Sequence, residues 1–186
     1  MNEEILVQVQ TTPNPNAQKF ILNQPVKLHG KATFFNAEAA AGHVLASALF
    51  AVEGVRQVHF FENVITITHA FDIDHSEFFE NIISVIKTRM PIHNPDFLME
   101  EEKQQRERSP LPPELAEIDA ILDRTIRPGL QADGGDVDVV ALNGKVLEIS
   151  YMGACGGCPS SYMGTLDAIE SILQQEYDPD LQVVIV

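Results

Sequence analysis

Two cysteines, Cys155 and Cys158, are the residues of this sequence best suited to chemistry, and the chain of 186 residues contains no others. They lie in the segment MGACGGCPSS, close enough in sequence for both thiols to reach one metal ion or each other. The glycines let the backbone turn tightly and point N–H groups at sulfur. Pro159 follows directly and is typical of the first turn of a helix, whose N-terminus favours negative charge. We therefore expect this setting to favour the thiolate form of both cysteines.

A cysteine pair of this kind fits three sites: a redox dithiol, half of a zinc site or half of an iron-sulfur site. Zinc and 4Fe-4S sites usually take four donors, whereas the chain offers two thiols and has no histidine after His93. A metal bound here would therefore bridge two chains, and it would be released easily, which suits delivery better than storage. A thioredoxin-type enzyme would be expected to show a longer βαβ frame and an aromatic residue near the motif. The pair alone does not decide among the three.

The residues around the cysteines predict a hairpin that leads into the motif, with a helix on either side. Asn143 and Gly144 are the strongest two-residue hairpin signal and separate two segments with strand character. The segment DGGD at 133–136 enters the first of these strands, and we interpret it as structural. In chain order we expect a helix from about residue 113, strands at 137–142 and 145–151, a helix from residue 159 and a strand at 181–186.

The first half of the chain predicts a second sheet with helices. We expect strands at 5–10, 19–22, 55–61 and 64–69, and helices at 37–50 and from residue 76. All six histidines lie between His29 and His93 without a His-x-x-x-His pair, so we assign them no metal or catalytic role.

Prolines and charged residues are concentrated in the segment 91–113, which is typical of a linker. We therefore predict an α+β fold with two small domains, each a short β-sheet packed against two helices. The first domain takes residues 1–90, the linker residues 91–113, and the cysteine domain residues 114–186. The first domain shows no catalytic constellation, and we predict that it recognises partner proteins or regulates the cysteine domain.

Composition excludes several classes of function. The formal net charge of −15 argues against nucleic-acid binding, which depends on lysine and arginine contacts with phosphate. No apolar stretch approaches the length of a membrane span, so we expect no membrane partner. Two cysteines so close together exclude a disulfide framework. The acidic first residues, MNEEILVQVQ, lack the pattern of a targeting segment, so we predict a cytoplasmic location.

Several longer segments resemble one protein family. LQADGGDVDVV, YMGACGGCPSS and GTLDAIESIL resemble the C-terminal domain of NifU-like proteins, also called Nfu. TPNPNAQKF, FFNAEAA, ALFAVEGV and ITIT resemble the domain that often precedes it. The resemblance implies a non-enzymatic carrier that receives an iron-sulfur cluster from an upstream assembly scaffold and delivers it to apo-proteins. It also implies a 4Fe-4S cluster bound between the two chains of a homodimer, with Cys155 and Cys158 as the ligands.

The sequence departs from the larger NifU proteins, which carry a separate scaffold domain with its own cysteines. This chain has no cysteine outside the motif, so we do not expect it to build clusters. Two alternatives use the same two residues. One is a thiol-disulfide oxidoreductase, and the other is a zinc-bridged dimer with a purely structural role.

Overall fold

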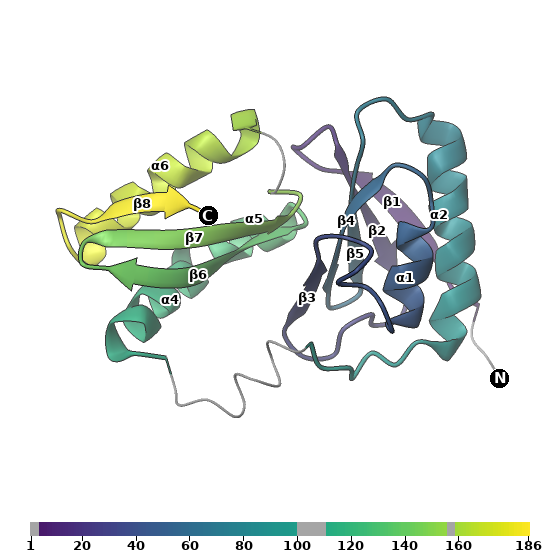
Figure 1. The fold of residues 1–186 in the computed structure, drawn as a ribbon, viewed down its shortest axis with the longest axis horizontal. Coiled ribbons are helices and arrows are strands. Elements are labelled where there is room, and N and C mark those ends of the chain that lie inside the picture. The colour runs from purple at the N-terminus through teal and green to yellow at the C-terminus, as the bar shows by residue number, and fades with distance from the viewer. Residues whose placement is uncertain (1–3, 100–110, 156–158) are drawn as a thin grey trace. The chain divides into compact units, whose positions relative to one another are not determined.

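The computed structural model describes residues 4–99, 111–155 and 159–186, with only the backbone for 159–163. They form two compact units that divide between Phe97 and Leu98. Each unit contains its own β-sheet and its own helices, so the predicted α+β fold with two small domains is confirmed (Figure 1). Within the described residues, no helix is both long and apolar enough to cross a membrane.

The first unit contains a five-stranded antiparallel sheet in the order β1-β2-β5-β4-β3, with two helices at one side of it (Figure 1). Its strands are β1 (Val7–Thr11), β2 (Ala17–Leu22), β3 (Lys31–Phe34), β4 (Val55–Phe61) and β5 (Val64–His69). Its helices are α1 (Val44–Phe50), α2 (His75–Arg89) and the short 3-10 helix η1 (Met90–Ile92). Phe20 and Phe60 from the sheet and Leu45 and Ile82 from the helices are fully buried, so sheet and helices share one core.

Helix α1 is shorter than the helix we predicted at 37–50. Residues 37–42 form turns, and Gly42 has a φ of 86°, a left-handed conformation that a continuing helix does not contain. The helix begins after His43, whose ring Nδ1 accepts a hydrogen bond from the Ala46 N–H at 3.0 Å. The run of alanines favours a helix, but the glycine and the histidine cap set its start.

The segment after η1 packs on the first unit, although it belongs to the linker that we predicted from residue 91. The Leu28 N–H donates to the Pro95 carbonyl at 2.9 Å, and Lys27 Nζ donates to the Phe97 carbonyl at 2.8 Å. The Phe97 ring stacks on Phe34 and lies 4.3 Å, centroid to centroid, from His43. The described part of the segment after η1 therefore forms no helix or strand, as its prolines predict, but it still packs against the first unit.

The second unit contains a three-stranded sheet in the order β6-β7-β8, covered by helices on one side (Figure 1). Its elements are α4 (Pro113–Thr125), α5 (Arg127–Ala132), β6 (Gly135–Asn143), β7 (Val146–Gly153), α6 (Pro159–Glu176) and β8 (Gln182–Ile185). Strands β6 and β7 pair antiparallel around a turn at Gly144 and Lys145, one residue later than the turn that we predicted at Asn143 and Gly144, and β7 and β8 pair parallel. The parallel pairing needs a crossover, which α6 provides.

The core of the second unit joins the helices to one face of the sheet. Ile118 and Leu122 of α4, Leu147 and Ile149 of β7 and Ile169 of α6 are fully buried in one cluster. Helix α5 is an addition to the two helices that we predicted. The first helix ends at Thr125, and the chain resumes a helical path at Arg127, with Pro128 in the first turn of α5, before it enters β6.

Candidate metal centre

Cys155 lies just beyond the end of β7, where the hairpin opens. Gly153 at the end of β7 pairs with Gly135 at the start of β6. The Ala154 N–H then donates to the Gly134 carbonyl at 3.0 Å, which extends the pairing by one step. The cysteine is therefore attached to the hairpin by backbone hydrogen bonds on its N-terminal side, and its side chain is partly buried.

Cys158 falls in the segment 156–158, outside the described residues. Helix α6 begins at Pro159, the residue that follows it, as the sequence predicts. The pairing of the two thiols on one metal thus stays a prediction. In the part of the chain that the structure describes, no group of three or more histidine, cysteine, aspartate or glutamate side chains could hold a metal ion.

The environment of the Cys155 thiol differs from our expectation. Burial, followed by the negative charges of Asp133 and Asp136, raises the pKa of this thiol to about 12. The expectation of a thiolate considered only the glycines and the following helix, whereas the fold places two carboxylates and the edge of the core beside the sulfur. In this conformation Cys155 is a protonated thiol at neutral pH. Because metals bind the thiolate, binding here releases a proton.

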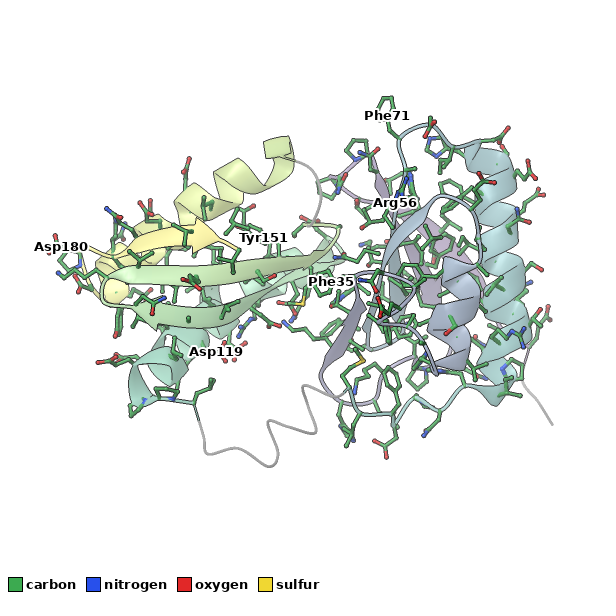
Figure 2. All side chains as sticks on the ribbon, viewed as in Figure 1. Phe35, Arg56, Phe71, Asp119, Tyr151 and Asp180 are labelled. Atoms are coloured by element: carbon green, nitrogen blue, oxygen red, sulfur yellow. The ribbon has the colours of Figure 1, made fainter. Side chains whose placement is uncertain are left out.

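Tyr151 of β7 lies on the core side of the same strand end, and Figure 2 shows its side chain beside the strand. Its side chain is buried, and its pKa is raised by that burial and then by the neighbouring Cys155. The partly buried Cys155 packs against the apolar cluster that contains this tyrosine. One side of the cysteine thus faces a medium of low polarity.

Arg127 of α5 is a buried cation next to the start of β6. Its guanidinium lies 2.5 Å from Asp119 and 2.7 Å from Asp123, and Figure 2 shows Asp119 on α4. Its Nε lies 3.6 Å from a carboxylate oxygen of Asp136 and donates to the Val137 carbonyl at 3.1 Å. Burial alone would lower its pKa, but hydrogen bonds and charge from Asp119 and Asp123 outweigh this and raise it. The arginine therefore stays charged and holds the start of β6.

Several histidines of the first unit make hydrogen bonds and ring contacts within that unit. His93 donates from Nε2 to the Val26 carbonyl at 2.7 Å, and its ring packs 5.4 Å from that of His43. His59 Nδ1 is hydrogen bonded to the Thr33 hydroxyl at 2.8 Å. The assignment of no metal or catalytic role to the histidines stays a prediction.

Comparison with known proteins accounts for both units. Residues 118–184 match the family described as NifU-like domain, and residues 7–93 match the family described as scaffold protein Nfu/NifU N terminal. A human protein named "NFU1 iron-sulfur cluster scaffold homolog, mitochondrial" is 31% identical over 185 residues, which cover 97% of this chain and 71% of the relative. The chain belongs to the NifU-like (Nfu) family. The predicted resemblance is confirmed.

This Nfu-family chain is shorter than several of its relatives. "NifU-like protein 5, mitochondrial" from Arabidopsis thaliana is 30% identical over 174 residues, which cover 91% of this chain and 63% of the relative. Among solved structures, a NifU-like protein from Saccharomyces cerevisiae matches with a TM-score of 0.46 and 22% identity, over 54% of this chain and 91% of that chain.

The predicted cytoplasmic location is wrong by these comparisons. The human relative and the two Arabidopsis relatives are all named mitochondrial. We based that prediction on the acidic charge of the first residues, which does not determine the compartment of a protein.

Proposed function

We propose that this Nfu-family chain is an iron-sulfur cluster carrier that binds a 4Fe-4S cluster between two chains and transfers it to apo-proteins. Membership of the family, which includes a relative named an iron-sulfur cluster scaffold homolog, carries the proposal. The cluster is cargo, received from an upstream assembly scaffold and passed on. The chain itself provides ligands and recognition and, we propose, catalyses no reaction.

The ligands proposed are Cys155 and Cys158. Cys155 supports this role by its place at the open end of the β6-β7 hairpin, where its side chain is partly exposed. Two thiols per chain supply half of the usual four ligands of a 4Fe-4S cluster, so a second copy completes the site. We infer a homodimer that forms when the cluster binds.

The apo state of Cys155 supports delivery. A thiol whose pKa is raised to about 12 binds iron only after losing its proton, and protonation competes with the metal at neutral pH. A carrier must give up its cluster, and a ligand that is readily reprotonated favours release. The same raised pKa argues against Cys155 as the attacking group of a thiol-disulfide oxidoreductase, because that group is a thiolate.

We propose three functional parts for the chain. A cluster-binding domain takes residues 114–186, a linker takes residues 91–113, and a first domain at 1–90 recognises client apo-proteins or regulates transfer. The separate cores of the two units support two domains, because each has the buried apolar side chains that a domain needs. The contacts of Pro95 and Phe97 with the first unit extend that domain into the first part of the proposed linker.

The test is anaerobic reconstitution with iron and sulfide, with iron and sulfide quantitation, Mössbauer spectra and mass determination. We expect about four irons per two chains, the composition of one 4Fe-4S cluster, and a dimeric mass. Cys155→Ala and Cys158→Ala should each abolish cluster binding, because each removes two of the four ligands in a dimer. A colourless monomer whose thiols cycle to a disulfide would instead support the redox alternative, and tightly bound zinc without iron uptake would support a structural dimer.

A further inference from the structure

Gly135 packs directly against Cys155 at the open end of the β6-β7 hairpin. A Cβ placed on Gly135 would lie 2.3 Å from Cys155 Sγ and 2.9 Å from the Cys155 backbone nitrogen. Both distances are shorter than any ordinary contact between such atoms, because packed carbon and sulfur atoms need well over 3 Å. The thiol therefore occupies the space that a side chain at residue 135 would fill.

Gly135 does not need to be glycine for its backbone conformation. Among the described glycines of the second unit, Gly134, Gly144 and Gly153 have positive φ, and Gly135 does not. An alanine at residue 135 would thus meet no torsional strain. The requirement at this position comes from packing against the cysteine.

The strand end that carries Gly135 is fixed from several sides. Asp136, which is 1% exposed, accepts hydrogen bonds from the Val137 N–H at 2.7 Å and from Gln131 Nε2 at 3.2 Å. Arg127 donates to the Val137 carbonyl, and the Ala154 N–H donates to the Gly134 carbonyl. Because these bonds join α5, β6 and the end of β7, the strand cannot move away from Cys155 without breaking buried polar contacts.

We propose that Gly135 is a positioning residue for the ligand Cys155: its missing side chain makes the recess that sets where the thiol lies. This inference rests on the proposed function for its consequence, which is cluster binding, but the recess is a property of the apo protein. A side chain at residue 135 forces the thiol to another rotamer and shifts the backbone at Cys155, since the nitrogen is also too close. From the sequence we interpreted the DGGD segment at 133–136 as structural. Through Gly135, this segment also sets the position of the Cys155 thiol.

The experiment compares Gly135→Ala with Gly129→Ala in the full chain. Gly129 lies in α5, and a Cβ there meets nothing within 4 Å, so this variant controls for adding a methyl group to a glycine in the same unit. Cluster loading is measured by anaerobic reconstitution. Thiol reactivity is measured with iodoacetamide at fixed pH in a Cys158→Ala background, where Cys155 is the sole thiol of the chain.

We expect Gly135→Ala to lower cluster affinity by about 10- to 100-fold, the range found when a group that orients a metal ligand is changed. We expect alkylation of Cys155 to become about tenfold faster, because displacement from the recess exposes the sulfur. Gly129→Ala should match the wild-type chain in both. Equal loading and equal alkylation in the two variants would overturn the proposal.

The two proposals fail separately. A wild-type chain that takes up no cluster would refute the carrier function, while alkylation of Cys155 would still decide the role of Gly135. Circular dichroism establishes that Gly135→Ala folds. If it does not, an NMR measurement on the wild-type apo chain decides: a nuclear Overhauser effect between the Gly135 α protons and the Cys155 β protons supports the recess, and its absence overturns it.

Discussion

Arg127 and Asp136 are charged side chains in the interior of the second unit. The side chain of Asp136 is 1% exposed and that of Arg127 is 9% exposed. Buried charges of this kind are tolerated only when paired and hydrogen bonded, as these are. Their role is to hold the strand end on which the site depends.

Replacing Arg127 with methionine should therefore destabilise the second unit strongly. The substitution leaves Asp136 buried without its cation, and breaking a buried pair in this way costs about 3 kcal/mol or more. Arg124→Met is the matched control, because Arg124 and Glu176 form an ion pair at the surface whose loss should cost less than about 1 kcal/mol. Urea unfolding followed by tyrosine fluorescence measures the effect, since all three tyrosines lie in the second unit and the chain has no tryptophan. Equal losses in the two variants would show that the buried network contributes no more than the surface pair.

Sequence reasoning at this scale proposed Cys155 as a ligand because two thiols close together in a glycine-rich segment are informative by themselves. It did not identify Gly135 as part of the site, because its contact with the thiol depends on the register of β6 against β7. The fold also brings the carboxylates of Asp133 and Asp136 near the sulfur. Together with burial, they raise the pKa of Cys155, whereas we had expected a thiolate. Pairing backward from the turn would not have placed Gly135 opposite Gly153, because an irregularity between Val139 and Ala141 shifts the register of β6 against β7 by one residue.

Elements were predictable where their pattern was long and their ends were marked. The β6-β7 hairpin and the helix after the cysteines agree with the prediction in type and order. Strand β3 was not predicted, because four residues at a sheet edge carry too little periodicity to be recognised. Helix α1 was predicted too long, because alanine content says nothing about the histidine cap that starts it.

The cap of α1 makes the first unit sensitive to acid. Burial and then the neighbouring His93 lower the pKa of His43 from 6.5 to about 4 in the folded chain. The unfolded chain therefore binds this proton first as pH falls, so stability present above pH 6.5 is lost progressively toward pH 4. Burial also lowers the pKa of His93, which adds to the loss in the same direction.

We expect the free energy of unfolding of the first unit to fall over this range, and His43→Asn to reduce the slope. Asparagine keeps a side-chain acceptor for the Ala46 N–H but does not titrate, so it isolates protonation from capping. Histidine ring NMR reports the first unit alone, because all six histidines lie in it. Thermal unfolding by circular dichroism at several pH values measures stability. An unchanged slope in His43→Asn would exclude His43 as the source.

The whole molecule combines a unit that carries the cysteines with a unit that carries no metal group in its described residues. The second unit has its own buried core from α4, α6 and the three-stranded sheet, so it should fold without the first. Both cysteines belong to it. We propose that the first unit contributes contact with client apo-proteins.

A fragment that starts at Pro113 separates these contributions. We expect it to take up the cluster as well as the full chain does, because the proposed ligands and their supporting contacts all lie within it. Transfer to apo-enzymes should be slower, since the fragment lacks the surface that holds the client near the cluster, and tethering of this kind raises the effective concentration to the millimolar range. Adding residues 1–99 as a separate chain should not restore the rate, because the tether is missing. Transfer by the fragment at the full rate to every client would contradict a recognition role for the first unit, whereas loss of cluster uptake in the fragment would show that the first unit supports the site itself.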